Sequence, residues 1–396
     1  MEHYFRFARA FTLAAVSSTP LSEYVCAAHV HSTHSDGTGT VAEIAEQAAE
    51  AGVDIVLLTD HDTLAARRAG EERWWGDVLV VVGCEISPRG GNHYLAFGIE
   101  REFDPRGMTA TEICAEVRRQ GGFGFAAHPA SRGVRALGPI ARPMPFQALA
   151  ADTADGVEVW SFVTDTVERL PGARTIPRFL ADPARWLVGP RPEVVRRWDE
   201  VGRVRRFPAI GGIDAHQAGV RVGGRVVLKL MAYRRSFRYL RTHLLTDGAL
   251  TGDPGEDRAT VLEALRAGRS FVALDVFAPA NGFRFWAERE RRGEGEPPAE
   301  GASEGADERS GRRRGAGSER AEMGSEVAGR GWRLCVESPR EATLRLLCDG
   351  AVRHEQHGRS LLASADAPGV WRVEARLAVD GRERTWVLTN PIYLRG

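Results

Sequence analysis

The sequence predicts an α/β protein in which a closed or distorted (β/α) barrel is followed by a small β-sandwich. Between residues 25 and 274, continuous apolar runs alternate with helical patterns, as is typical of parallel strands covered on both faces. About seven such runs occur, which fits a barrel better than an open sheet. After residue 274 the pattern changes to short alternating strands, and a chain of 396 residues exceeds one ordinary domain.

Each element of the barrel has its own signal. The predicted strands are Cys26–His31, Asp54–Thr59, Val78–Val82, Tyr94–Ile99, Phe123–Ala127, Gly156–Trp160 and Ala209–Ile213. Helices are predicted at Thr40–Ala51, Thr109–Gln120, Arg191–Val201, Tyr239–Leu245 and Thr260–Arg266. The first helix is the best marked, because Thr40 and Glu43 have capping-box spacing and Gly52 suits the left-handed position after its end.

We expect three parts: an N-terminal extension over residues 1–24, the barrel over 25–274, and the β-sandwich over 275–396. Strands are predicted at Phe271–Leu274, Phe283–Ala287, Leu344–Leu347, Val370–Ala375 and Thr385–Leu388, with turns at Asp349-Gly350 and Asp380-Gly381. Residues 289–331 are mainly Gly, Glu, Arg, Ser and Ala. They can bury too little apolar surface to offset their ordering entropy, so we predict a disordered insert.

Composition narrows the classes of function. Hydrophobic residues make up 43% of the chain and the formal net charge is zero, which argues against a nucleic-acid coat or an anionic membrane as the partner. The odd count of five Cys without a Cys-x-x-Cys motif favours buried free thiols in a reducing compartment. The apolar run Ala10–Val16 is short and lacks a convincing cleavage site, and no run reaches transmembrane length. We therefore expect a cytoplasmic protein.

The stretch His29-Val30-His31 is the first candidate for chemistry. Alternate residues of a strand face the same side, so His29 and His31 are expected to project together, a geometry suited to one metal ion. Asp36 follows in a Ser-Asp-Gly turn that can fold back over the same point. Two histidines in a strand can also be inert, and the rest of the chain decides between these interpretations.

Metal-competent residues recur at the ends of successive predicted strands. Because the carboxyl ends of barrel strands share one rim, these side chains are expected to meet there. They are His29 and His31 with Asp36, then Asp60, His61 and Asp62, then Glu85, His128, Asp214 and His216. Each has a structural alternative: His61 could cap a helix, and His128 could be a satisfied core histidine. A carboxylate directly after five apolar residues, as at Glu85, is costly unless it is paired or binds metal, and five such coincidences together favour a metal site.

Four further residues lie near these motifs. His34 lies in the loop and is expected to be exposed, whereas His93 could approach the site or be structural. Arg132 and Arg135, just after His128, are candidate phosphate contacts, with exposed arginines as the alternative.

In this order and spacing, the motifs resemble those of the PHP (polymerase and histidinol phosphatase) family over roughly residues 25–275. The C-terminal part is similar to the CehA/McbA-like metallohydrolase branch, which also closes with an Asn-Pro-Ile-Tyr run, here Asn390–Tyr393. The resemblance implies a distorted (β/α)7 barrel that holds two or three divalent ions, with Zn, Mn or Fe as the usual candidates.

The same resemblance implies a ligand set. Its members are His29, His31, Glu85 and Asp214 for the first ion, a bridging Glu85 with His128 for the second, and Asp36, His61 and His216 for a third. Two departures leave the number of ions open. The strand at Gly156–Ser161 has no His where many members have one, so Glu158 or a water could serve there, and Asp36 stands where some members have His.

The expected activity is hydrolysis of a phosphomonoester or phosphodiester by a hydroxide that bridges two ions. Glu85 would bridge the two ions. Asp60, Asp62 or a ligand histidine would orient a ligand or protonate the leaving group. Arg132 would contact the phosphate. The expected partner is a small phosphorylated molecule or nucleotide, with no membrane and no stable nucleic-acid partner. A carbamate or carboxylic ester hydrolase on the same site is one alternative. A binding protein that uses the β-sandwich is another. The sequence predicts neither the substrate nor the oligomeric state.

Overall fold

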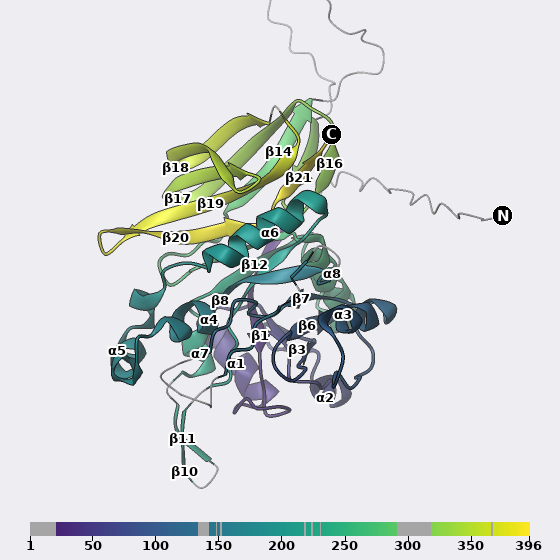
Figure 1. The fold of residues 1–396 in the computed structure, drawn as a ribbon, viewed down its shortest axis with the longest axis vertical. Coiled ribbons are helices and arrows are strands. Elements are labelled where there is room, and N and C mark those ends of the chain that lie inside the picture. Colours follow the sequence, from purple (N-terminus) through teal and green to yellow (C-terminus); the bar gives the residue numbers. More distant parts are fainter. Residues whose placement is uncertain are drawn as a thin grey trace, which may run out of the picture.

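The computed structural model describes residues 21–133, 142–147, 149–150, 153–217, 219–222, 225–229, 231–290, 318–365 and 367–396. It is a mixed α/β protein in which the long C-terminal strands form one layer and the N-terminal strands and most helices lie below them (Figure 1). Residues 1–20 of the predicted extension lie outside the described residues. The first strand begins at Leu21, four residues before the predicted boundary.

Within the described residues, the larger sheet has fourteen strands. Its path runs β15 (Ser318–Glu322), β14 (Arg284–Glu290), β17 (Trp332–Cys348), β19 (Gly369–Val379), β20 (Arg382–Thr389), β13 (Ser270–Ala273), β12 (Arg241–Asp247), β1 (Leu21–Val30), β2 (Ile55–Leu58), β4 (Val78–Val82) and β3 (Trp74–Trp75). Off this path lie β16 (Glu326–Ala328), β18 (Ala351–Ala365) and β21 (Ile392–Arg395). As predicted, β1, β2 and β4 are parallel and fully apolar where they pair.

The second sheet has five strands, and a separate hairpin projects from the body. The sheet consists of β5 (Cys84–Ile86), β6 (Tyr94–Phe97), β7 (Phe123–Ala126), β8 (Gly156–Ser161) and β9 (Ala209–Gly212). Strands β7, β8 and β9 are parallel, whereas β5 and β6 pair antiparallel. The hairpin is β10 (Gly219–Val222) with β11 (Arg225–Lys229), and it extends away from the other elements in Figure 1.

Strand pairing does not confirm the predicted (β/α)7 barrel, because the ladders do not close. The chain leaves the larger sheet at Gly83, where a Cβ atom would lie 2.6 Å from the Phe97 ring, and enters the second sheet as β5. Isolated bridges, Val30 with Ala215 and His61 with Glu85, join the two sheets. Both bridges lie beside predicted site residues, so the two sheets meet at the site.

Capping boxes mark the start of two of the helices among the described residues. They are α1 (Val41–Ala51), α2 (Ala65–Arg68), α3 (Ala110–Arg119), α4 (Phe162–Thr166), α5 (Ile176–Ala181), α6 (Pro192–Val204), α7 (Tyr233–Ser236) and α8 (Pro254–Ala267), with 3₁₀ turns at Val167–Arg169, Ala173–Thr175 and Pro183–Trp186. The predicted capping box of Thr40 and Glu43 is present, and Gly52 is left-handed with φ 70°. A second capping box, Thr109 with Glu112, opens α3.

The prediction of a helix at Tyr239–Leu245 is wrong. Most of this segment belongs to β12, which pairs with β1 on one side and β13 on the other. Thr242 Oγ also donates to the carbonyl of Gly211 at 3.0 Å. Two strand neighbours therefore override an apolar spacing that is equally compatible with a helix.

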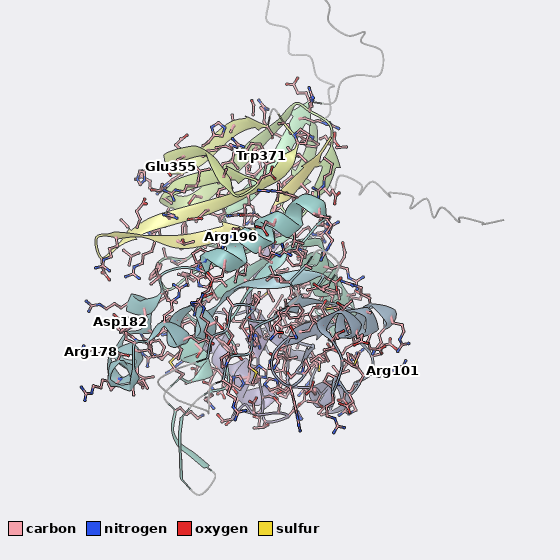
Figure 2. The ribbon with its side chains drawn as sticks, in the orientation of Figure 1. Arg101, Arg178, Asp182, Arg196, Glu355 and Trp371 are labelled. Atoms are coloured by element: carbon pink, nitrogen blue, oxygen red, sulfur yellow. The ribbon has the colours of Figure 1, made fainter. Side chains whose placement is uncertain are left out.

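The C-terminal strands do not confirm a separate β-sandwich, because β20 pairs with β13 and so continues the larger sheet. The predicted turns are correct: Asp349-Gly350 and Asp380-Gly381 have positive φ at both residues, as a tight hairpin turn requires. Charged side chains such as Arg101, Arg178, Asp182, Arg196 and Glu355 extend into solvent, whereas Trp371 is buried (Figure 2).

The predicted disordered insert is too long at both ends. Arg289 and Glu290 belong to β14, and β15 and β16 lie within its last fifteen residues. Arg289 bonds Glu319 at 2.7 Å and its guanidinium lies 4.5 Å from the Trp332 ring centre, so side-chain pairs add to the backbone ladder there. Residues 291–317 lie outside the described residues.

The Asn-Pro-Ile-Tyr run packs against the strand that leads to Asp214. The Asn390 amide accepts from the Ala209 backbone at 2.7 Å and donates to the carbonyl of Ala209 at 2.9 Å. The Tyr393 hydroxyl accepts from the Phe207 N–H at 2.9 Å. The C-terminal strands therefore fix the start of β9, whose other end carries site residues.

All five cysteines are free and buried, as predicted. Within the described residues, no helix has the length and apolar character that crossing a bilayer requires.

Candidate metal centre

The carboxylate of Glu85 is surrounded by imidazoles. One oxygen, Oε2, lies 3.2 Å from a ring nitrogen of each of three histidines, namely His29, His31 and His61. The other oxygen, Oε1, lies 2.8 Å from His93 Nδ1 and 3.2 Å from His128 Nε2. Glu85 is 1% exposed. The two oxygens therefore face two different groups of ring nitrogens, which is the arrangement a bridging carboxylate needs.

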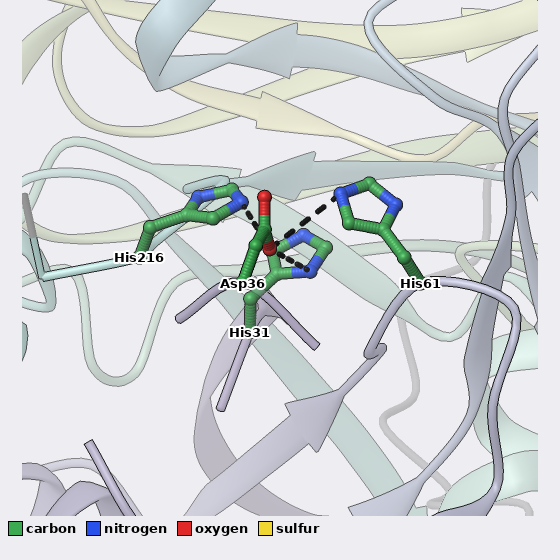
Figure 3. A group of neighbouring side chains, drawn as sticks. All are labelled: His31, Asp36, His61 and His216. Atoms are coloured by element: carbon green, nitrogen blue, oxygen red, sulfur yellow. Dashed lines mark ion pairs between the residues drawn. The ribbon is translucent and has the colours of Figure 1, made fainter. Parts of the chain in front are cut away.

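A second group gathers around Asp36, at the more exposed side of the centre. Its carboxylate lies 3.1 Å from His216 Nε2, 3.7 Å from His61 Nε2 and 3.8 Å from His31 Nδ1 (Figure 3). His31 and His61 thus face both Glu85 and Asp36 with opposite ring nitrogens. The Ser-Asp-Gly turn folds back over the histidines as the sequence predicts.

The third group, formed by His29, His128 and Asp214, has strained backbones. Their φ values are 63°, 29° and 57°, in the left-handed region that residues with side chains rarely adopt. His29 interrupts the pairing of β1 with β2 as a bulge, so its convergence with His31 does not arise from simple strand alternation. Such conformations persist where the surroundings enforce them, and they cluster at functional sites.

The donor set fits divalent cations. Four groups of three or four ligand atoms, each within 4.8 Å of one another, can be drawn from these residues. Ligand atoms about 2.1 Å from one tetrahedral ion lie about 3.4 Å apart, close to the distances around Glu85. His31 is fully buried, yet neither of its ring nitrogens makes a hydrogen bond with any described residue. Carboxylate oxygens of Glu85 and Asp214 lie 3.2 and 3.4 Å from its Nε2 without forming a hydrogen bond. A buried imidazole that lacks hydrogen bonds is costly, and a cation bound between it and these carboxylates would relieve that cost.

The charges of the centre are strongly coupled. Burial alone would raise the pKa of Glu85, but the adjacent His29, His128 and His31 hold it well below its usual range. Burial opposes protonation of His128 and His216, yet hydrogen bonds and the charges of Glu85, Asp214 and Asp36 raise the pKa of each imidazole to about 9. The carboxylates are thus ionised and ready to bind cations, which must displace protons from the histidines.

The other predicted catalytic residues lie around this centre, outside the ligand groups. Asp60 is buried and its carboxylate accepts from Ser32 N, Ser32 Oγ and Ser35 Oγ at 2.6–2.7 Å, so it holds the loop that carries Asp36. Asp62 is exposed, and its carboxylate accepts from Ser87 N at 2.8 Å.

The sequence predicts two phosphate contacts, Arg132 and Arg135, and the structure describes Arg132. Its exposed guanidinium donates to Glu193 at 2.6 Å. Arg135 lies outside the described residues.

His34 bonds Glu71 at 2.6 Å, away from the centre, whereas His93, whose role was left open, joins the centre through Glu85. Glu158 contacts His29 and is not part of any of the four groups. Sequence reasoning missed Tyr233, whose hydroxyl donates to the carbonyl of His31 at 2.7 Å. It lies 202 residues further along, and no local pattern marks it.

Comparison with known proteins supports the resemblance in part. The model of the PHP domain family matches residues 27–123, a stretch that holds His29, His31, Asp36, His61 and Glu85. The resemblance is confirmed for that stretch, whereas the CehA/McbA-like branch stays a prediction.

Two curated relatives match short stretches of the chain. The phosphoribosyl 1,2-cyclic phosphate 1,2-diphosphodiesterase of Eggerthella lenta is 44% identical over 81 residues, which are 18% of this chain and 30% of that protein. An uncharacterized protein of Methanocaldococcus jannaschii is 33% identical over 97 residues, 24% of this chain and 55% of that protein. The chain thus spans about a third to a half of the lengths of these relatives.

Two solved structures are similar at low identity. One is a two-domain protein from Bacteroides vulgatus containing a predicted PHP-like metal-dependent phosphoesterase, with a TM-score of 0.40 and 14% identity over 94% of this chain and 98% of that one. The other is a putative metal-dependent phosphoesterase from Bifidobacterium adolescentis, with a TM-score of 0.32 and 17% identity over 51% of this chain and 91% of that one. At these TM-scores, neither structure decides the function of this chain.

Proposed function

We propose that this protein is a metal-dependent phosphoesterase that acts on a small phosphorylated molecule or nucleotide. One observation carries the proposal: five imidazoles surround the buried carboxylate of Glu85. Glu85 with His29, His31 and Asp214 would hold one divalent ion, and Glu85 with His128 a second, as their mutual contacts of 3.2–3.4 Å allow. His61, His216 and Asp36 would hold a third, and the ions are proposed to be Zn, Mn or Fe.

The reaction class is supported by the PHP match over residues 27–123 and by the phosphodiesterase name of the Eggerthella lenta relative. A phosphodiester is therefore the first substrate class to test, and a phosphomonoester the second. We also propose membership of the CehA/McbA-like branch, on the closing Asn390–Tyr393 run, and a cytoplasmic location, on the five free thiols. A carbamate or carboxylic ester remains an alternative bond for the same centre.

Residues of this chain would position the substrate and move protons. Divalent ions held in the centre would supply an activated water and neutralise charge that develops on phosphoryl oxygens. Partial burial raises the pKa of Asp62 above its usual value, and Asp62 faces solvent, so it is the better candidate to protonate a leaving group. Asp60, fully engaged by Ser32 and Ser35, would orient the loop of Asp36.

Arg132 is the proposed phosphate contact. With Ser131 and Phe146 it lines a cavity of about 320 Å³ that begins one residue after His128. A guanidinium binds phosphate oxygens in a bidentate manner, and the exposed pair with Glu193 is weak enough to exchange for a substrate.

The test is a side-by-side assay of aryl phosphate, bis-aryl phosphate and aryl acetate with chelator-treated protein supplied with Mn²⁺, Zn²⁺ or Fe²⁺. We expect metal-dependent turnover of at least one phosphate ester, with Glu85→Gln as the matched inactive control. Turnover of the aryl acetate alone would contradict a phosphoesterase and support the alternative, a carboxylic ester hydrolase. Failure of the protein to bind any of these metals would overturn it.

A further inference from the structure

We propose that Glu158 is a positioning residue, which fixes the ring of His29 and the backbone of His128 in the metal centre. This inference depends on the metal centre proposed above. Sequence analysis left open whether Glu158 is itself a ligand, because it lies on a strand that lacks the expected histidine. The structure instead points to a role one contact away from the ions.

Both oxygens of Glu158 are already engaged. Oε1 lies 3.0 Å from His29 Nδ1, and Oε2 accepts a hydrogen bond from the backbone N–H of His128 at 2.5 Å. The side chain is 0% exposed. None of the four candidate ligand groups among the described residues includes Glu158. To bind a cation directly, Glu158 would have to release either the His29 ring or the His128 N–H.

The contact with His29 has a chemical consequence. A carboxylate accepts hydrogen bonds and donates none, so Glu158 favours the neutral ring form of His29 that carries its proton on Nδ1. The lone pair is then on Nε2, which lies 3.2 Å from Glu85 Oε2 and 3.4 Å from Asp214 Oδ1. Carboxylates that orient a ligand histidine in this way raise its basicity and fix its ring.

The contact with His128 acts on the backbone. His29 and His128 have φ values of 63° and 29°, conformations that cost free energy unless neighbouring groups enforce them. Glu158 bonds both residues, through the ring of one and the N–H of the other. One side chain therefore fixes two strained candidate ligands, one from β1 and one from the loop after β7, relative to each other.

The neighbouring strand leaves room for this carboxylate. A Cβ atom on Gly212 of β9 would lie 1.7 Å from Glu158 Oε1, much closer than any real contact. A glycine at this position is therefore required for Glu158 to reach His29. Gly212 has no positive φ, so its small size and not its backbone freedom is what the site uses.

The experiment compares zinc binding by the wild type, Glu158→Gln and Glu158→Asp, after chelator treatment and far-UV circular dichroism to confirm folding. Gln keeps the volume but offers one acceptor to two donors, and Asp keeps the charge but is one methylene shorter. We expect Zn²⁺ affinity, measured by titration calorimetry, to fall about 10–100-fold in Glu158→Gln and less in Glu158→Asp. Long-range ¹⁵N–¹H spectra of the zinc-loaded protein should show Nδ1-protonated His29 in the wild type and a mixture of ring forms in Glu158→Gln.

A matched control is Glu23→Gln, because Glu23 contacts the ring of His243 at 2.8 Å in a buried position that contributes no ligand group. It should lower stability without changing Zn²⁺ affinity. Wild-type zinc affinity and an unchanged His29 signature in a folded Glu158→Gln or Glu158→Asp variant would overturn the inference and leave the proposed function standing. If the wild type binds Mn²⁺ or Fe²⁺ but not Zn²⁺, the same comparison is made with that metal, and absence of binding of all three metals would instead overturn the proposed function.

Discussion

The molecule contains two arrangements of buried histidine between carboxylates, and only one has the properties of a metal centre. In the first, Glu85, Asp36 and Asp214 have only histidines as ion-pair partners among the described residues. In the second, His243 lies between Glu23 at 2.8 Å and Asp275 at 3.2 Å. Both arrangements hold fully buried imidazoles, so burial alone does not separate them.

The difference lies in how completely the polar atoms are paired. Both ring nitrogens of His243 are bonded, Glu23 also pairs with Arg284 at 2.5 Å, and Asp275 pairs with Arg241 at 3.0 Å. Neither ring nitrogen of His31, by contrast, makes a hydrogen bond with any described residue. Arginines supply the missing positive charge at His243, whereas at Glu85 it must come from protons or from cations. Incomplete pairing, and not the count of histidines, therefore distinguishes the candidate metal centre from the arrangement at His243.

The strongest test of this comparison removes the shared carboxylate. Glu85→Gln should lose bound metal and lower phosphoesterase activity by more than about 100-fold, because even residues that only support metal ligands cost about 10–100-fold. Elemental analysis and aryl phosphate hydrolysis measure the two effects. Glu23→Gln, the same change at the other arrangement, should leave both unchanged. Full metal content in Glu85→Gln would show that the two arrangements do not differ as argued.

Added metal should stabilise the protein through the first arrangement alone. Ligands that bind only the folded state contribute about 2.7 kcal/mol at a hundredfold excess over Kd. We therefore expect Mn²⁺ or Zn²⁺ to raise the unfolding temperature of the wild type and of Glu23→Gln by equal amounts, and not that of Glu85→Gln. A thermal melt with chelator as the baseline checks this, and equal shifts in all three proteins would indicate binding elsewhere.

The second arrangement should instead affect stability through pH. Burial opposes the charge on His243, but Asp275 and Glu23 raise its pKa, so its contribution is full below about pH 6.5 and is lost as pH rises through the folded pKa. The pKa of Glu23 is lowered, mainly by His243 and Arg284 acting against burial, so its contribution is present above about pH 4.3 and is lost as pH falls through the folded pKa. The free energy of unfolding of the wild type should exceed that of Glu23→Gln most between these two pH limits, by roughly 1–3 kcal/mol. Urea unfolding of metal-free protein at pH 5.5 and 8.5 measures this, and a larger difference at pH 8.5 would contradict it.

Local signals explain which parts of the fold could be predicted. The capping box of Thr40 and Glu43 and the tight turn at Asp349-Gly350 depend on neighbouring residues, and both are correct. The segment of β12 was predicted as a helix because its strand state depends on β1 and β13, which are distant in the sequence. The closing of the ladders into a barrel, likewise a long-range property, is not confirmed.

The candidate site follows the same rule. Residues directly after apolar strands, such as His61 and His128, could be predicted because strand ends meet at one rim. The place of His93 could not, since it depends on the antiparallel pairing of β5 with β6, which brings it against Glu85. The sequence marks Glu158 only as a departure from the family pattern, because its contacts with His29 and His128 depend on the three-dimensional structure.

The smallest expected effect concerns Arg132, which follows His128 by four residues and forms an exposed ion pair with Glu193. Its pair with Glu193 is exposed and contributes less than about 1 kcal/mol, so Arg132→Ala should barely change stability. If the guanidinium exchanges Glu193 for a substrate phosphate, KM should rise several-fold while kcat and metal content stay unchanged. Arg106→Ala, which removes another exposed, carboxylate-paired arginine, is the matched control. An unchanged KM in Arg132→Ala would limit the functional part of the molecule to the histidine-lined centre and leave Arg132 as a surface residue.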